Sequence, residues 1–167
     1  MTAHILVTYT TRTESTAEIA AAIGKELQVK GYLVDIADMK EITSIEKYDA
    51  IVLGAPVYMG HIEKKLLSFI TRNREMFAKI PFAVFIVGIA PVSPQAGAVD
   101  TVLDQLRKAA SPLKPVALTM FAGRLERKTQ SFLKRTMIDI MKVPTGDFRN
   151  WDDISEWAQG LPVLLEL

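Results

Sequence analysis

The chain has 167 residues, of which 49% are hydrophobic and 23% charged, with only 9 glycines and 8 prolines. This composition excludes wholesale disorder and indicates one globular domain over residues 1–167. Twenty basic and nineteen acidic side chains give a formal net charge of +1, so overall charge does not direct the chain to nucleic acid. The absence of cysteine excludes disulfides, thiolate nucleophiles and Cys-ligated metal centres, so redox chemistry here requires a bound cofactor.

Two features of the sequence argue against a membrane-spanning or exported protein. The longest apolar run, residues 80–92, is broken by Pro81, Gly88 and Pro91 and falls short of the about 20 residues that a spanning helix needs. The N-terminus enters an apolar segment within a few residues and lacks the basic start of a signal peptide. We therefore expect a cytoplasmic protein.

Five short apolar segments alternate with longer segments of helical spacing, which is the pattern of a parallel sheet covered on both faces. The expected strands are residues 5–9, 33–37, 50–53, 82–87 and 116–121. Three of them are nearly continuous apolar runs, as strands buried on both sides are, whereas segment 33–37 is the least apolar and suits a sheet edge. The sequence therefore predicts a doubly wound α/β fold.

Helices are expected between and after these strands. The first begins at a Ser15 or Thr16 cap and ends at Gly31. Further helices are expected around residues 66–70, 99–106, 128–142 and 152–159, the last two as additions beyond the fifth strand. The tryptophans in the final region, Trp151 and Trp157, are expected to pack in the core.

The loop after the first strand has the composition of a phosphate site. Its sequence, TTRTEST over residues 10–16, places five hydroxyls and one guanidinium at a helix N-terminus, where free N–H groups and the helix dipole favour an anion. It has neither the glycine-rich P-loop nor the GxGxxG pattern, so a small phosphate monoester is the expected ligand. The alternative is that these hydroxyls only cap the helix.

This loop resembles the phosphate loop of flavodoxins. It reads Thr11-x-Thr13-x-Ser15-Thr16, similar to the T/S-x-T-G-x-T motif with which that family holds the phosphate of FMN. Glu14 stands where the family usually has glycine, which adds a negative charge beside the expected phosphate and removes a residue tolerant of positive φ. A swing of this side chain to solvent, or a pairing with the neighbouring arginine, would leave the site open.

Two further loops carry the same resemblance. Segment 54–61, GAPVYMGH, is similar to the G-x-P-x-Y-x-G segment that flavodoxin-like proteins lay against the isoalloxazine ring, and residues 87–90 match the second loop beside the flavin. The resemblance implies a flavodoxin-like five-stranded sheet of order 2-1-3-4-5 with one noncovalently bound FMN. The implied cofactor contacts are Thr11, Arg12, Thr13, Glu14, Ser15, Thr16, Pro56, Val57, Tyr58, Met59, Gly60, Gly88, Ile89 and Ala90.

In this interpretation Tyr58 and Met59 contact the flavin, and backbone groups near Gly60 meet its N5 edge. The alternative is a plain turn with a core tyrosine. We expect His61 to cap a helix or face solvent, with a proton relay as the other possibility, and His4 to lie at a strand edge. The two histidines form no metal site with recognisable ligand spacing, and no side chain is assigned as acid, base or nucleophile.

The region after the fifth strand resembles one group within the flavodoxin-like proteins. Residues 122–125, 132–142 and 145–151 look like the C-terminal part of flavodoxin-like proteins that include the menaquinone-dependent protoporphyrinogen oxidases. The segment from Arg124 to Lys142 carries six basic and two acidic side chains together with an apolar stripe. Such a helix suits an anionic membrane surface, at the inner membrane face, or an acidic partner. The alternative is that the stripe packs on the sheet.

The resemblance leaves three functions open. The first is an FMN-dependent oxidoreductase that moves electrons from a porphyrinogen-like substrate to a quinone or another acceptor. The second is a soluble flavodoxin that carries single electrons between redox proteins, although a carrier is expected to have an acidic docking surface and the net charge is +1. The third is a module that has lost FMN and binds only partners, for which Glu14 is the motivating feature.

Overall fold

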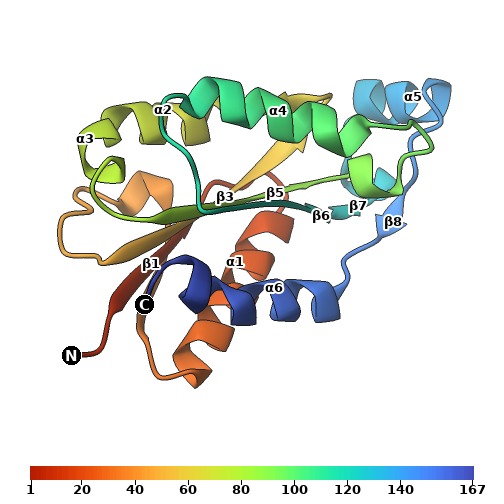
Figure 1. Cartoon of the computed structure of the whole chain (residues 1–167). Helices are drawn as coiled ribbons and strands as arrows, with labels where there is room; N and C mark the ends of the chain where they lie inside the picture. Colours follow the sequence, from red (N-terminus) through yellow and green to blue (C-terminus); the bar gives the residue numbers. More distant parts are fainter.

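The computed structural model describes residues 1–167, and its centre is a parallel sheet (Figure 1). The strand order is β2-β1-β3-β5-β6, which confirms the expected flavodoxin-like order of the five main strands. The strands are β1 (His4–Tyr9), β2 (Leu33–Asp38), β3 (Ala50–Tyr58), β5 (Phe82–Gly88) and β6 (Ala117–Ala122). As predicted, the least apolar strand, β2, lies at an edge.

Helices cover both faces of the sheet (Figure 1). On one face lie α1 (Ser15–Val29) and α6 (Trp151–Leu164), and on the other lie α2 (Lys64–Arg72), α3 (Arg74–Phe77) and α4 (Ala98–Ala110). Three short 3-10 turns are η1 (Met39–Glu41), η2 (Ala90–Val92) and η3 (Arg127–Thr129). None of the helices combines the length and the hydropathy needed to cross a membrane, and the cytoplasmic location stays a prediction.

Two apolar clusters, one on each face, form the core. On the α1 side, Ile19, Ile23 and Leu27 are fully buried against the sheet, and Trp157 of α6 packs edge-on against Phe85 at a centroid distance of 6.2 Å. Each such side chain contributes about 1.5–3 kcal/mol when it is fully removed from water. The prediction that Trp157 packs in the core is confirmed, because it lies against this buried cluster.

The prediction that Trp151 packs in the core is wrong. Trp151 begins α6 and is 44% exposed, with the Arg149 guanidinium 4.8 Å from its ring centroid. Asn150 caps this helix, since its side-chain oxygen accepts bonds from the N–H groups of Asp152 and Asp153. The cap starts α6 at Trp151, on the solvent side of the helix, and α6 then runs further than the expected residues 152–159.

The third strand also differs from its expected range of 50–53. β3 continues to Tyr58 and turns back through β4 (His61–Ile62), which pairs antiparallel with Val57 and Tyr58. Met59 and Gly60 form a two-residue turn with φ of 51° and 78°, the left-handed conformations that tight hairpin turns require. The segment expected as a loop is therefore a tight hairpin.

The start of α1 corrects a further expectation. Glu14, not Ser15 or Thr16, is the N-cap residue, and it adopts a left-handed φ of 62° without a side-chain cap hydrogen bond. Ser15 and Thr16 lie buried in the first turn. The left-handed position that the flavodoxin motif fills with glycine is thus present here, occupied by a glutamate.

The addition after β6 is an excursion that leaves the sheet. It runs from β7 (Arg124–Leu125) through η3 and α5 (Phe132–Ile140) to β8 (Gly146–Asp147), which pairs antiparallel with β7. The helix is shorter than the expected residues 128–142, because Ser131 caps it by accepting a bond from the N–H of Lys134. No residue of α5 is buried, so the alternative in which its stripe packs on the sheet is wrong.

Gly54 in β3 offers a test of the core packing. A Cβ at this position would collide with three ring atoms of the buried Phe85, so we expect Gly54→Ala to lower the free energy of unfolding by about 1–3 kcal/mol in urea denaturation. The control is Gly160→Ala in α6, where a Cβ meets nothing within 4 Å and helix propensity raises stability by up to about 1 kcal/mol. Equal stabilities of the two variants would contradict this packing.

Candidate functional site

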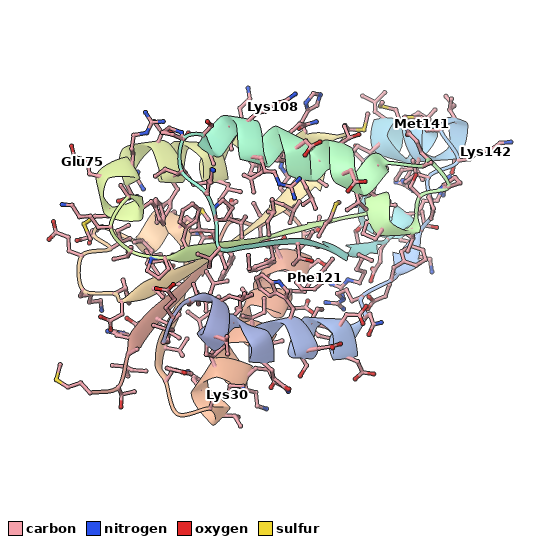
Figure 2. The ribbon with its side chains drawn as sticks, in the orientation of Figure 1. Lys30, Glu75, Lys108, Phe121, Met141 and Lys142 are labelled. Carbon is pink, nitrogen blue, oxygen red and sulfur yellow. The ribbon has the colours of Figure 1, made fainter.

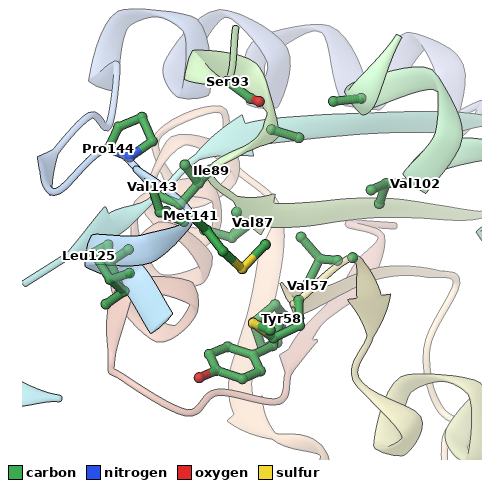
Figure 3. Close-up of a pocket in the computed structure, with 18 of the residues that line it drawn as sticks. Val57, Tyr58, Val87, Ile89, Ser93, Val102, Leu125, Met141, Val143 and Pro144 are labelled. Atoms are coloured by element: carbon green, nitrogen blue, oxygen red, sulfur yellow. The ribbon is translucent and has the colours of Figure 1, made fainter. Parts of the chain in front are cut away.

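A cavity of about 890 Å³ opens at the carboxyl ends of the parallel strands (Figure 3). Twelve of the fourteen predicted cofactor residues line it, and Thr11 and Glu14 do not. The twelve are Arg12, Thr13, Ser15, Thr16, Pro56, Val57, Tyr58, Met59, Gly60, Gly88, Ile89 and Ala90. The three loops that the sequence singled out therefore meet around one space, because parallel strands bring their carboxyl ends to the same edge.

The loop of residues 10–16, which we call the threonine loop, leads into α1 and contains polar groups that have no hydrogen-bond partner. The Thr11 hydroxyl oxygen is buried and has no hydrogen-bond partner, which is costly for a buried polar atom. The first turn of α1 has no side-chain cap. The Ser15 N–H donates to the Thr13 carbonyl at 2.7 Å, whereas the N–H groups of Thr16 and Ala17 have no partner and remain free to bind an anion. The interpretation of the hydroxyls as helix caps alone therefore has no support in the cap geometry.

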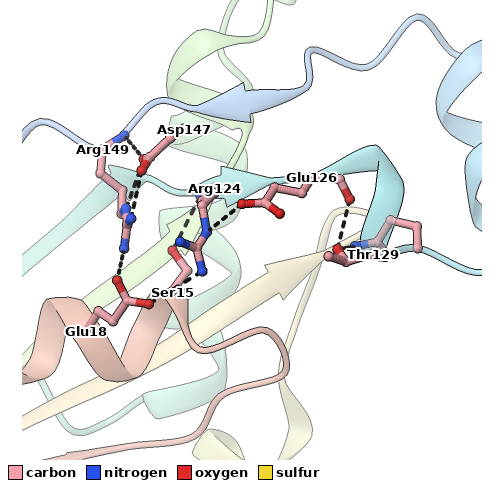
Figure 4. Close-up of polar contacts among 8 residues, drawn as sticks. Ser15, Glu18, Arg124, Glu126, Thr129, Asp147 and Arg149 are labelled. Atoms are coloured by element: carbon pink, nitrogen blue, oxygen red, sulfur yellow. Dashed lines mark hydrogen bonds and ion pairs between the residues drawn. The ribbon is translucent and has the colours of Figure 1, made fainter.

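The Ser15 side chain does not cap α1 and contacts the segment after β6 instead. Its side-chain oxygen accepts a bond of 3.4 Å from the backbone N–H of Arg124 (Figure 4), so it joins α1 to β7. Gly123, just before β7, lies close enough that a Cβ there would be 3.5 Å from the Ser15 hydroxyl oxygen. The first turn of α1 and the excursion after β6 thus pack directly on each other.

Glu14 is exposed and does not pair with Arg12, so of the two arrangements that would leave the site open, the one in which Glu14 faces solvent is present. The Arg12 Nε donates to Glu63 at 2.6 Å, and its guanidinium lies 5.4 Å from the ring centroid of Tyr58. The hydrogen bond from Arg12 lowers the pKa of the Glu63 carboxyl. Arg12 is therefore occupied in joining the threonine loop to the β3–β4 hairpin, and the charge of Glu14 is left unneutralised by it.

Tyr58 lines the cavity and does not lie in the core. Besides Arg12, Lys134 of α5 approaches its ring, with Nζ at 4.9 Å from the centroid. Cations over an aromatic face are attracted by its quadrupole, typically by about 0.5–1 kcal/mol at exposed sites. On the other side of the hairpin, Gln105 of α4 donates to the Gly60 carbonyl at 3.0 Å. The Tyr58 ring and the Met59–Gly60 turn are therefore contacted by the threonine loop, by α5 and by α4.

Sequence reasoning missed the far wall of the cavity. The α5 region supplies it through Met137, Ile138, Met141, Val143 and Pro144, several of which are labelled in Figure 3. The signal was present as the i, i+4 and i+7 spacing of positions 134, 138 and 141, but only the folded excursion shows that this side faces the flavin loops. The cavity is thus wider than the three loops alone would make it.

Sequence reasoning also missed a charged cluster that anchors the excursion after β6 to α1 (Figure 4). The Arg149 side chain is only 5% exposed and donates to both Asp147 oxygens, at 2.9 and 2.7 Å, and to Glu18 of α1. The hydrogen bonds from Arg149 lower the pKa of Asp147 to about 2, and the bond to Asp147 raises the pKa of Arg149 further above its usual range. Arg124 reaches Glu18 as well, at 3.4 Å.

The lining of the cavity is apolar and basic. Its charged members are Arg12, Arg124, Lys134 and Lys142, and no carboxylate lines it. His61 lies exposed in β4, outside the lining, so the solvent-facing expectation is confirmed and a relay through this histidine has no support. A helix N-terminus with threonines in its lining, beside an aromatic hairpin and apolar walls, fits a phosphate attached to a flat ring system.

The chain belongs to the flavodoxin domain family, whose model matches residues 6–152. Protoporphyrinogen IX dehydrogenase [quinone] of Escherichia coli strain K12 is 25% identical over 174 residues, which cover 96% of each chain. Among solved structures, oxidised flavodoxin 1 from Bacillus cereus is 14% identical and covers 98% of this chain and 97% of its own, with a TM-score of 0.56. A short-chain flavodoxin associated with a PDU bacterial microcompartment is 14% identical with 96% coverage of both chains and a TM-score of 0.58.

These similarities confirm the flavodoxin-like fold and the resemblance on which the sequence interpretation rests. They also support FMN as the cofactor of a flavoprotein that transfers electrons, because FMN is the cofactor that the flavodoxin resemblance implies. The residues that bind it are not settled by family membership and remain the prediction drawn from the loops.

Two substitutions of Glu14 can separate the effect of its left-handed backbone conformation on stability from the effect of its charge on FMN binding. Glu14→Gly relieves a left-handed residue, so we expect the free energy of unfolding to rise by up to about 1 kcal/mol, whereas Glu14→Gln leaves it unchanged. Both variants remove a negative charge beside the anion site, so both should bind FMN about fivefold more tightly at low ionic strength. The gain should shrink in high salt. Fluorescence titration with FMN and urea denaturation measure the two effects, and unchanged FMN affinity in both variants would place the phosphate elsewhere.

Proposed function

We propose that this chain is an FMN-dependent oxidoreductase that takes electrons from a reduced organic substrate and passes them to a quinone-type or other acceptor. The observation that carries the proposal is the far wall of the cavity, which α5 adds opposite the flavin loops. Ligand pockets usually measure about 300–1,000 Å³, and this one, at about 890 Å³, lies near the upper end of that range. That size, and a wall beyond the three flavin loops, suit a second molecule beside the cofactor.

The threonine loop would hold the FMN phosphate through the hydroxyls of Thr11, Thr13 and Thr16 and the N–H groups of the first turn of α1. Tyr58, Met59 and Ile89 would flank the ring, and the backbone of the Met59–Gly60 turn would lie at its edge. When bound, FMN supplies the electron transfer itself. The work of the protein is to orient the ring and to exclude water from it.

The α5 wall would receive the substrate. Met137, Ile138 and Met141 offer apolar contact to a flat molecule, and Lys134 offers a positive charge at the same wall. A reduced, largely apolar ring compound with acidic substituents matches this surface. The similarity to the E. coli protein named protoporphyrinogen IX dehydrogenase [quinone] supports a porphyrinogen-like donor and a quinone acceptor.

A second candidate is a soluble carrier of single electrons between redox proteins, which the likeness to solved flavodoxins favours. Carriers of this kind steer docking with complementary charge. The surface near the cavity is instead basic, since every charged residue of its lining is a cation. The carrier would therefore need an acidic partner, and the oxidoreductase remains the better supported function.

Binding of FMN by the threonine loop is tested by comparing FMN with riboflavin, which lacks the phosphate. We expect Thr11→Ala and Thr13→Ala each to weaken FMN binding by about tenfold or more, because a hydrogen bond to a charged group contributes about 1.5–3 kcal/mol. Riboflavin affinity should not change. Quenching of flavin fluorescence measures both affinities.

The matched control is Thr71→Ala, an exposed threonine of α2 whose hydroxyl bonds the Leu67 carbonyl and does not line the cavity. It should leave both affinities unchanged. Wild-type protein that binds riboflavin as tightly as FMN would contradict the phosphate site.

The two candidate functions differ in how the FMN-loaded protein accepts electrons. For the oxidoreductase we expect anaerobic reduction, followed by absorbance, to proceed in one two-electron step. We also expect protoporphyrinogen to be oxidised when a quinone is supplied. Flavin-free protein is the control for uncatalysed oxidation. Two well-resolved one-electron steps without turnover would favour the carrier and overturn the oxidoreductase.

A further inference from the structure

The outer side of α5 exposes large apolar side chains that belong to neither core cluster. Phe132, Leu133 and Ile140 are 78%, 76% and 74% exposed, and we call these three the α5 outer face. α5 lies beyond the carboxyl end of the sheet (Figure 1), and Figure 2 shows side chains projecting from it into solvent. Exposed apolar residues gathered on one helix mark an interaction surface.

The segment that carries this face has an excess of positive charge. Residues 124–142 contain six basic and two acidic side chains, an excess of four positive charges in a chain whose net charge is only +1. Both carboxylates are occupied, since Asp139 pairs with Arg127 at 2.7 Å and Glu126 with Arg124 at 3.5 Å. Four cations of the segment have no carboxylate partner: Lys128, Lys134, Arg135 and Lys142. Of these, Lys134 and Lys142 line the cavity, whereas Lys128 and Arg135 lie outside its lining.

We propose that the α5 outer face docks on an anionic lipid bilayer. Apolar side chains of such a helix enter the boundary between headgroups and acyl chains, and the surrounding lysines and arginines bind lipid phosphates. Their long aliphatic stems lie along the apolar surface while the charged ends reach the headgroups. The surface of α5 combines these two features, and the carboxylates that would repel anionic lipid are neutralised by Arg124 and Arg127.

The size of the surface favours a lipid over a protein partner. A helix of nine residues is about 14 Å long, whereas a stable protein interface buries about 800 Å² on each side. The α5 outer face consists of three apolar side chains on one short helix, and the other apolar residues of α5, Met137 and Ile138, line the cavity. A bilayer needs no matching shape, so apolar insertion and unpaired cations are sufficient for it.

Docking would link the membrane to the cavity, and this step rests on the proposed function. Met137, Ile138 and Met141 of the same excursion line the cavity, so the bilayer would lie against its α5 wall. A quinone-type acceptor dissolved in the bilayer would then be close to the site that it has to reach. The docking itself does not depend on the identity of the substrate.

The test is co-sedimentation of the full FMN-treated chain with vesicles of phosphatidylcholine alone and of equal parts phosphatidylcholine and phosphatidylglycerol. We expect binding to the anionic vesicles only, with a partition coefficient that falls in high salt. The variant Phe132→Ser, Leu133→Ser, Ile140→Ser should bind at least about tenfold more weakly. Lys128→Gln should cost about fivefold, since one cation near an anionic surface contributes about that factor.

The control is Val29→Ser, Val163→Ser, which removes two equally exposed apolar side chains, 78% and 83% exposed, from α1 and α6. It should bind as the wild type does. Absence of binding to anionic vesicles, equal binding to neutral vesicles, or equal loss in the control would overturn the proposal. So would self-association through α5, detected by sedimentation velocity without vesicle binding.

Flavin fluorescence in the same samples keeps the two proposals apart. Vesicle binding without FMN binding would support docking and refute the oxidoreductase. FMN binding without vesicle binding would refute docking and leave the oxidoreductase in place.

Discussion

Parallel pairing of strands buried on both faces is the constraint on which the remaining structure depends. β1, β3 and β5 lie side by side in one direction, with apolar residues facing both helical layers. Their connections must therefore cross back over the sheet, and the segments that follow them all emerge at one edge. The threonine loop, the Tyr58 hairpin and the residues after β5 meet for this reason, although up to 80 positions separate them in the chain.

Beyond this sheet, the excursion after β6 is the second feature that distinguishes the molecule. The β7–β8 pair carries α5 out from the sheet, and a largely buried arginine, Arg149, ties its base to α1 through Asp147 and Glu18. A charge buried in this way is stabilising only when its partners are in place, because desolvation must be offset by good hydrogen bonds. The anchor allows α5 to remain exposed and still keep one side against the cavity. It thereby gives one short helix two surfaces with different tasks.

Both surfaces point to the same kind of chemistry. The inner side supplies an apolar wall with a cation, opposite loops that fit a flavin, and the outer side is apolar and basic in the manner of interfacial helices. A protein that transfers electrons between a flat reduced compound and a lipophilic acceptor requires access to both. The flavodoxin fold by itself requires neither kind of access. The proposed function therefore rests on the excursion after β6.

The sequence by itself determined the fold class, and its loop motifs carried the resemblance that implied the strand order and the family, because buried parallel strands and loop motifs are local patterns. It did not determine the roles of side chains whose partners lie far away in the chain. Arg12 pairs with Glu63, 51 positions on, Ser15 holds Arg124, and Arg149 donates to Glu18. Spacing along the chain carries no information on such pairs. The hairpin at Met59–Gly60 depended likewise on pairing between β3 and β4, and the two sides of α5 could be assigned only when the tertiary structure placed one against the cavity and the other in water.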